Sequence, residues 1–358
     1  MRAPPHALLA ATLLVLAACG ERRAAPPVVT LGAAPDTVST TFSELTAGVW
    51  LGGDRWAVLA APDERVALVD AGKRTLASLG GDPSKELRNP STLFRAGDTL
   101  YVGDWGMRRT SLWTLDGRFV GALPVSDATR GTLPQARDAA GRFYLELKPR
   151  PGPDGSGNRD SAAVVAAGPN FERADTLARL APLDIAQVTG DAGTRFERRV
   201  FSGADQWGAL PDGSVWVARV YDNHVDWRSP EGEWHRGEPL PDRVLEVTRY
   251  DRELFLRRFP PELRVTAQQL PFAAVKPPFE AAWSAPDGEV WLERSRAPVD
   301  SSRGYQIVDR QGILRREVRV PGPGRLVAVG SDAVLVAEPA RDGVRLLRFT
   351  VPAAPAGP

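Results

Sequence analysis

The sequence predicts an all-β fold, a six-bladed β-propeller whose blades each contain four antiparallel strands. Three observations predict it. A short sequence motif, here called the phrase, occurs six times; a turn glycine, the second mark, follows most copies at a similar distance; and the last unit lacks one strand. The phrase is clearest as LPDGSVWVA at 210–218 and as APDGEVWLE at 285–293.

Each copy of the phrase has Asp or Gly, then one variable residue, then three mostly apolar residues. Because β-branched and aromatic residues follow a turn residue, each copy predicts a strand that begins after a tight turn. A spacing near 44 residues indicates repeated supersecondary units, and two longer spacings indicate insertions of about 30 residues. The copies begin at Asp54, Asp98, Gly141, Gly213, Gly288 and Asp332, at intervals of 44, 43, 72, 75 and 44 residues.

A glycine that starts a new polar and apolar alternation follows each of the first five copies by 18 to 27 residues. Glycine permits the positive φ that a tight hairpin requires. A third strand lies between the two marks, and another apolar run precedes most copies, so each unit has four strands. The glycines are Gly72, Gly117, Gly168, Gly232 and Gly312, and the third strands are 65–71, 111–116, 162–167, 224–229 and 305–310.

The sixth unit ends before its outermost strand, because its second mark would fall near Thr350. A three-stranded blade would leave an open edge that invites aggregation. An N-terminal segment should therefore complete the last blade and close the ring. The candidates are residues 28–31 (VVTL) and residues 37–42 (TVSTTF).

Two segments of the chain resemble the NHL and TolB-like six-bladed propellers of bacterial lipoproteins. They are SLWTLDGRFVGAL at 111–123 and LPDGSVWVARVYDNHVDWRSPEGEW at 210–234, and the likeness extends over about residues 42–350. The resemblance implies the fold, but its motifs specify blades and no chemistry.

The first 18 residues have the pattern of a signal peptide, with Arg2 before an apolar run that is too short to span a bilayer. Leu16-Ala17-Ala18-Cys19 resembles the lipobox of bacterial lipoproteins, in which the cysteine is lipidated. Cys19 is the only cysteine, so no intrachain disulfide is possible. We expect a lipidated Cys19 and tether over 19–40, a propeller over 41–350 and a tail over 351–358. An unlipidated secreted protein is the alternative.

In such a propeller, the loops between second and third strands and the links between blades open on one face. The long additions, 148–160, 181–204 and 241–278, all fall in these loops. Within 242–259 apolar residues recur at helical spacing, with Asp242 as the N-cap, so we expect a helical insertion between blades four and five that Pro260-Pro261 ends. Insertions on one face often mark a binding face, although loops also simply tolerate insertion.

The same loops contain the candidate binding residues, which are Asp104, Trp105, Arg108, Asp222, His224, Arg294 and Arg296. Arginine binds carboxylates through its planar guanidinium and tryptophan supplies contact area, so a rim of this kind suits a polar ligand or a peptide. The alternative is a solvated charged rim. His224 would be a base or ligand, or an ordinary polar residue of a hairpin.

A loop with oxygen donors at alternate positions offers a weak calcium candidate. Its donors are Asp154, Ser156, Asn158 and Asp160. Arg159 occupies the position where an EF-hand has glycine, and Val165 the position of its bidentate glutamate, so a flexible polar loop is the alternative. No cofactor is otherwise predicted, because the motifs of nucleophile elbows, phosphate loops and zinc-protease helices are absent.

These observations predict a monomeric propeller attached by its lipid to a bacterial membrane, either the outer membrane or the periplasmic side of the inner membrane. Its partner would be an extracytoplasmic protein or a small polar ligand. The formal net charge is +1, which gives no indication of nucleic-acid binding. The alternative function is a hydrolase of the lactonase or esterase-like type, which would require a metal at the channel mouth held by three or four inward-facing donors.

Overall fold

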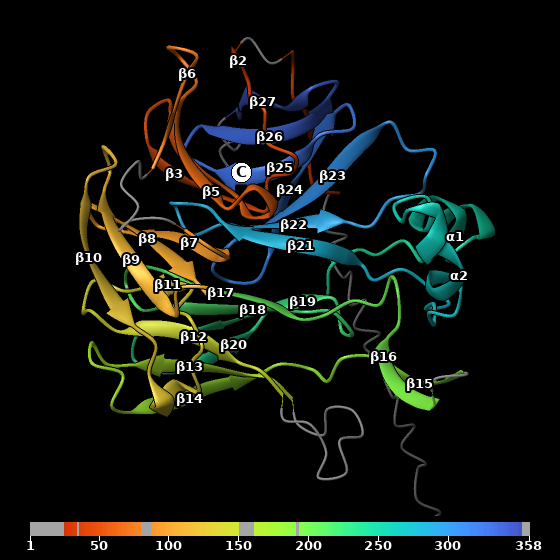
Figure 1. The fold of residues 1–358 in the computed structure, drawn as a ribbon, viewed down its shortest axis with the longest axis horizontal. Coiled ribbons are helices and arrows are strands. Elements are labelled where there is room, and N and C mark those ends of the chain that lie inside the picture. The colour runs from red at the N-terminus through yellow and green to blue at the C-terminus, as the bar shows by residue number, and fades with distance from the viewer. Residues whose placement is uncertain (1–24, 34–35, 80–86, 150–160, 191–192, 353–358) are drawn as a thin grey trace, which may run out of the picture.

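The structure is a computed structural model that describes residues 25–33, 36–79, 87–149, 161–190 and 193–352. It is a six-bladed β-propeller (Figure 1). Blade 1 contains β3 (Ala47–Gly52), β4 (Arg55–Ala60), β5 (Arg65–Asp70) and β6 (Thr75–Ser78), and blade 2 contains β7 (Pro90–Ala96), β8 (Thr99–Asp104), β9 (Arg109–Thr114) and β10 (Phe119–Pro124). Blade 3 contains β11 (Ala136–Arg137), β12 (Phe143–Leu147), β13 (Ala163–Ala167) and β14 (Ala174–Arg179).

The remaining blades continue the same antiparallel order. Blade 4 contains β17 (Gln206–Ala209), β18 (Val215–Arg219), β19 (His224–Arg228) and β20 (Trp234–Arg236). Blade 5 contains β21 (Phe279–Ser284), β22 (Val290–Arg294), β23 (Ser302–Val308) and β24 (Leu314–Pro321). Blade 6 contains β25 (Arg325–Val329), β26 (Ala333–Ala340) and β27 (Gly343–Thr350). The predicted second and third strands are all present.

The ring closes on itself, because each innermost strand lies beside the innermost strand of the next blade. The neighbours in order are β3, β7, β11, β17, β21 and β25, and β25 returns to β3. The predicted number of blades is therefore confirmed.

An N-terminal strand completes the last blade, as predicted. β2 (Asp36–Ser39) pairs antiparallel with β27, with Val38 opposite Leu346. The other candidate segment has a different position, because β1 (Val28–Thr30) pairs parallel with β24 and adds a fifth strand to blade 5. The N-terminal segment thus covers the outer edges of two neighbouring blades.

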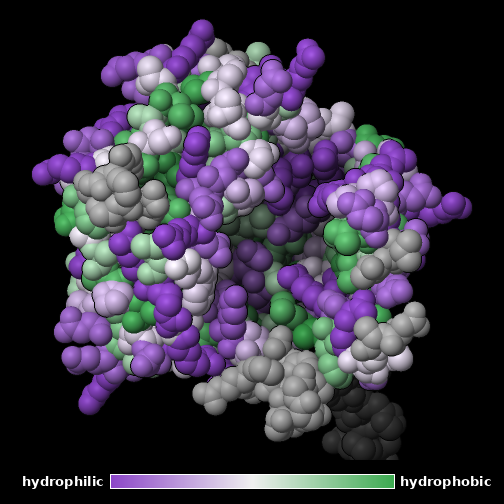
Figure 2. All heavy atoms as spheres, viewed as in Figure 1, coloured by the Kyte–Doolittle hydropathy of each residue, from purple (hydrophilic) through white to green (hydrophobic). Residues whose placement is uncertain are grey.

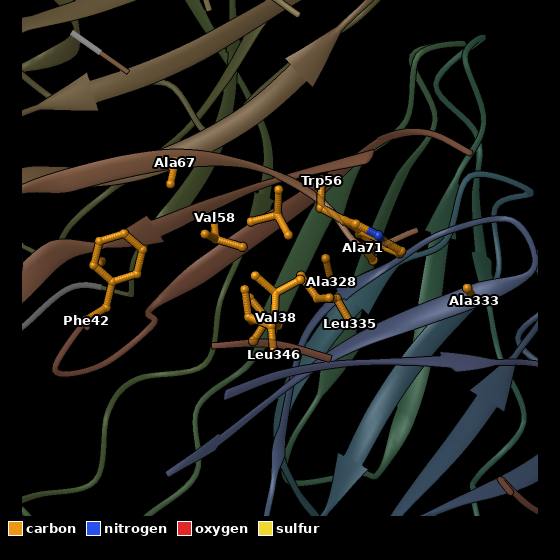
Figure 3. Close-up of a cluster of buried hydrophobic side chains, with 13 residues drawn as sticks. Val38, Phe42, Trp56, Val58, Ala67, Ala71, Ala328, Ala333, Leu335 and Leu346 are labelled. Carbon is orange, nitrogen blue, oxygen red and sulfur yellow. The ribbon is translucent and has the colours of Figure 1, made fainter. Parts of the chain in front are cut away.

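Val38 shows how the closing strand is held. It is 5% exposed and lies in the cluster between blades 6 and 1, with Leu346 and Leu335 from blade 6 and Val58 from blade 1 (Figure 3). Burial of a valine side chain contributes about 1.5–3 kcal/mol. Packing between blades, in addition to the strand pairing, therefore stabilises the closure.

Similar clusters fill the other boundaries between blades. Four tryptophans are almost completely buried in them, and three of the four come from second strands, where the repeated phrase places an apolar residue. They are Trp56, Trp216 and Trp291 on second strands and Trp113 on a third strand. Trp50 and Trp283, on the innermost strands of blades 1 and 5, are partly buried and line the channel.

Two insertions interrupt the regular order of strands. The hairpin β15 (Ile185–Gly190) and β16 (Gly193–Arg198) lies between blades 3 and 4. Helices α1 (Arg249–Leu256) and α2 (Pro261–Gln268) lie between blades 4 and 5, as predicted. None of the helices in the described part of the chain has the length and apolar character needed to cross a membrane.

The bounds of the helical insertion differ from the prediction. The N-cap of α1 is Thr248 instead of Asp242, because Thr248 and Asp251 form a reciprocal capping box. Pro261 begins α2 instead of ending the helical region. A proline fits the first turn of a helix because its missing N–H would have no partner there.

Candidate functional site

The strands of each blade alternate in direction, so the loops between second and third strands and the links between blades share one face of the ring. We call this face, which carries loops 105–108, 220–223 and 295–301 and both insertions, the insertion face. In Figure 1 the hairpin and the helices project from the same side of the ring. The predicted binding residues of blades 2, 4 and 5 belong to this face, but blades 2 and 5 lie across the ring from each other.

A cluster of phenylalanines joins the two insertions. The ring centroid of Phe255 on α1 lies 5.9 Å from that of Phe201, 5.3 Å from that of Phe259 and 5.7 Å from that of Phe272. Phe272 also forms a bridge with Val200, just after β16. Edge-to-face aromatic pairs of this kind contribute about 0.5–1.5 kcal/mol each beyond their buried area. The cluster therefore fixes α1 against the segment that leaves the hairpin.

A buried ion pair fixes the other end of the helical insertion. Lys276 Nζ donates to Asp251 Oδ1 at 2.6 Å and to the carbonyl oxygen of Arg296 at 2.8 Å. Burial alone would raise the pKa of Asp251, but hydrogen bonds from Lys276 and Thr248 lower it below its ordinary value. The pair connects α1 with the segment that enters blade 5 and with the loop that follows β22.

These contacts enclose a cavity of about 480 Å³ beside blade 5. Its walls come from the end of β16, from α1, from the start of blade 5 and from β23 and β25. Figure 2 shows a hollow between the ring and the helices with hydrophilic side chains inside it. The walls carry six cationic side chains and two carboxylates, and we call this site the cationic pocket. Its cations are Arg198, Arg258, Lys276, Arg296, Arg303 and Arg325, and its carboxylates are Asp251 and Glu280.

A third carboxylate, that of Glu293, lies behind the wall of the cationic pocket. It is completely buried and pairs with Arg303, while Arg325 Nε lies 3.8 Å from Glu293 Oε2. Among the residues that the structure describes, none forms a hydrogen bond to Oε2. Burial raises the pKa of Glu293 and Glu280 adds to this effect, whereas the arginines oppose it.

The guanidinium of Arg296 is partly buried, and the charged groups that act on it are Arg303 and the carboxylates of Glu280, Glu293 and Asp300. Burial and the nearby charge of Arg303 lower the pKa of Arg296 below its ordinary value. The only hydrogen bond of its guanidinium within the described residues goes to the backbone, where Nη1 donates to the carbonyl oxygen of Asp300 at 3.3 Å. An anion in the pocket would stabilise the charged form of Arg296, which burial disfavours.

An apolar groove of about 570 Å³ adjoins the cationic pocket. Both are lined by Ser202, Gly203, Lys276 and Pro277, so these residues form the ridge between them. The groove continues along residues 272–275 and toward Tyr221, in the loop between β18 and β19 of blade 4.

The channel of the ring contains a separate cavity of about 310 Å³, lined by residues of all six innermost strands. Its walls include Trp50, Trp207 and Trp283 together with Arg95 and Arg137. Within the described residues, no group of three or more His, Cys, Asp or Glu side chains is placed to hold a metal ion.

The predicted residues of blade 2 do not reach the cationic pocket. Asp104 is completely buried, and its carboxylate accepts backbone N–H groups of Arg88, Asn89 and Met107 at 2.8, 3.2 and 2.9 Å. Its burial argues against contact with a ligand and gives it a role in shaping the loop. Trp105 and Arg108 are exposed on that loop.

The two predicted residues of blade 4 differ in exposure. His224 is 2% exposed, and its Nε2 lies 2.9 Å from Asp226 Oδ1. Asp226 also accepts a hydrogen bond from Arg219, which pairs with Asp205 at 3.0 Å. Asp222 is exposed on the preceding loop. His224 thus belongs to a buried ionic network within blade 4.

Of the two predicted arginines of blade 5, only Arg296 lines the cationic pocket. Arg294 points across blade 5 and pairs with Glu317 on β24 at 3.2 Å. The sequence did not single out Arg198, Arg258, Lys276, Arg303 or Arg325. The basic stretch Arg257-Arg258 before Pro260 was a possible signal, but Arg303 and Arg325 stand in no distinctive motif.

Several predictions fall outside the described residues. These are the signal peptide, the lipidated Cys19 and the calcium candidates Asp154, Ser156, Asn158 and Asp160. They stay predictions.

No protein-family model matches the chain, and no curated protein sequence matches it. Its fold is similar to solved propeller structures at low identity. Regucalcin, a calcium-binding protein from Agrobacterium tumefaciens, is 9% identical with a TM-score of 0.44, over 92% of this chain and 98% of that one. A member of the DUF4221 family from Bacteroides vulgatus is 10% identical with a TM-score of 0.46, over 89% and 96%. A gluconolactonase from Xanthomonas campestris is 12% identical with a TM-score of 0.43, over 92% and 99%.

These similarities carry no functional conclusion for this chain. The class of protein that the fold defines is the six-bladed β-propeller. The NHL or TolB-like type stays a prediction.

Proposed function

We propose that the chain is a lipid-anchored propeller of the bacterial cell envelope that binds an extracytoplasmic partner or ligand at its insertion face. The observation that carries this proposal is the cationic pocket, which both insertions build together. If the loops merely tolerated these insertions, the two insertions would not need to be fixed to each other. Here the phenylalanine cluster and the buried Lys276–Asp251 pair fix the insertions to each other and to blade 5.

The character of the walls supports binding more than hydrolysis. Arginine guanidinium groups recognise charge without a chemical step. Within the described residues, the cationic pocket contains no histidine or cysteine, and its one serine, Ser202, donates its hydroxyl to the carbonyl oxygen of Arg199 at 2.7 Å. Ser202 therefore has no base beside it that would activate it as a nucleophile.

The membrane anchor is tested by the Cys19→Ser variant of the full chain. We expect the wild-type protein in the membrane fraction and incorporation of labelled fatty acid. The variant should incorporate no label and should lose the lipid-dependent attachment. A wild-type protein that incorporates no fatty acid would refute the anchor, whereas the binding role would stand on the second experiment.

The binding face is tested by a photoreactive amino acid placed at Leu254 on α1, at the lip of the cationic pocket. The matched control is Val120 on β10, a more exposed apolar residue on the outer strand of blade 2. In native envelopes we expect an adduct that is specific to position 254. Equal adducts at both positions, or none at 254, would contradict the proposed face.

A further inference from the structure

We propose that the cationic pocket binds a small anion that carries two or more negative charges on carboxylate or phosphate-type groups. This inference rests on the proposed function and names the ligand class of the same site. The geometry that supports it is a recess in which six cations from six separate segments face two carboxylates.

Pairing within the pocket leaves part of the positive charge uncompensated. Asp251 neutralises Lys276, and Glu293 is shared by Arg303 and Arg325. No carboxylate of the described residues forms an ion pair with the three other arginines, and Arg198 donates only to Ser202. The unpaired cations are therefore Arg198, Arg258 and Arg296.

Arginine guanidinium groups are well suited to this ligand class, because their planar N–H forks match carboxylate and phosphate oxygens. A recess also screens charge less than an open surface does. A volume of about 480 Å³ is within the usual range for small-molecule sites. The site is thus of a size for a small polyanion, bound by the guanidinium groups of Arg198 at the end of β16, Arg258 just after α1 and Arg296 in the loop after β22.

Glu293 makes the site sensitive to protonation. An anion that draws Arg303 and Arg325 toward itself weakens their pairing with the buried Glu293 carboxylate. The groups that face Glu293 are Arg303 and Tyr305 on β23, Arg325 on β25, Glu280 on β21 and Arg296 in the following loop. Protonation of Glu293 releases the two arginines for the ligand, so binding should be accompanied by proton uptake.

Calorimetry of the purified full chain tests the ligand class, with succinate, citrate, inorganic phosphate and sulfate as probes and glucose as the neutral control. We expect saturable binding of at least one anion, and a loss of affinity of about tenfold or more in Arg296→Ala and in Arg258→Ala, since tenfold corresponds to only about 1.4 kcal/mol. The ranking of citrate and succinate against phosphate and sulfate distinguishes carboxylate from phosphate-type ligands.

The matched control is Arg294→Ala, which removes an equal charge two residues from Arg296 but outside the pocket. Its affinity should equal that of the wild type. An equal loss in this control would show a general charge effect and overturn the inference, as would the absence of saturable binding by all four anions. In the latter case an adduct at position 254 would still support the proposed function.

The protonation step is tested with sulfate, because sulfate keeps its charge between pH 5 and pH 8. The wild-type affinity should rise as the pH falls. Glu293→Gln should bind more tightly at neutral pH and show a smaller dependence on pH. Asp222→Asn, an exposed change outside the pocket, provides the comparison and should keep the wild-type affinity and pH dependence. A pH dependence that is unchanged in Glu293→Gln would overturn the role of Glu293.

Discussion

Two buried carboxylates on the insertion face have opposite roles. Asp104 ends the second strand of blade 2, and Glu293 is the penultimate residue of the second strand of blade 5. Both are completely buried. Asp104 accepts three backbone N–H groups, whereas Glu293 meets two arginines that line a pocket and has one oxygen without a hydrogen bond.

The difference lies in the kind of group that satisfies each charge. Backbone N–H groups are held by the fold, so the carboxylate of Asp104 organises a loop and has no capacity left for a ligand. Arginine side chains can change their orientation toward another anion, so the arginines that pair with Glu293 remain able to bind a ligand. In this comparison the backbone satisfies the structural carboxylate, Asp104, whereas arginines that line a pocket satisfy Glu293.

Asp104→Ala should have the largest effect on stability. It removes three hydrogen bonds to a charged group and leaves three backbone donors without partners, each worth about 1–3 kcal/mol. We expect the free energy of unfolding to fall by about 3 kcal/mol or more, measured by urea denaturation. Asp222→Ala, on an exposed loop, should cost less than about 1 kcal/mol, and a similar small cost for Asp104→Ala would contradict its structural role.

Asp138→Ala should have a smaller effect with a characteristic pH dependence. Burial tends to raise the pKa of Asp138, but hydrogen bonds from Arg142 and Tyr144 lower it below its ordinary value. Its contribution is therefore complete above the unfolded pKa, about 3.9, and is lost as the pH falls through the folded value. We expect a cost of about 2 kcal/mol at neutral pH. The difference between wild type and variant should shrink from pH 5 to pH 2.

Glu293→Gln should show the opposite sign. Because burial raises the folded pKa of Glu293, the native state binds the proton more tightly than the unfolded chain does. The stability of the wild type relative to the variant is then greatest below the unfolded pKa and declines as the pH rises toward the folded value. Urea denaturation of both proteins between pH 4 and pH 8 measures this. A relative stability that increases with pH would show that the arginines outweigh burial.

Most of the fold was predictable because its signals are local. The turn residues at Asp98 or Gly213 and the apolar run that follows each act within a few residues, and repetition makes them visible. The sequence predicted that an N-terminal strand must close the ring, but it did not predict which segment supplies that strand. Both 28–31 and 37–42 have strand-forming residues, and only the pairing of Val38 with blade 6 distinguishes them.

The cationic pocket was mostly unpredictable for the opposite reason. Its arginines at 198, 258 and 325 are far apart in the sequence and meet only after both insertions have folded. The chain has 45 Lys and Arg residues, so no single arginine stands out. Arg294 and Arg296 had the same sequence context, but strand alternation directs Arg294 to Glu317 and leaves Arg296 in the loop.

Arg294→Ala should have the smallest effect. Its pair with Glu317 is partly exposed, and such pairs contribute about 0–1 kcal/mol. We expect the free energy of unfolding to fall by less than about 1 kcal/mol, with anion affinity unchanged. Urea denaturation and sulfate calorimetry of the same preparation measure both quantities. A clear loss of anion affinity would show that anion binding depends on the total charge of the insertion face, including Arg294. An unchanged affinity would instead show that the residues of the cationic pocket recognise the anion.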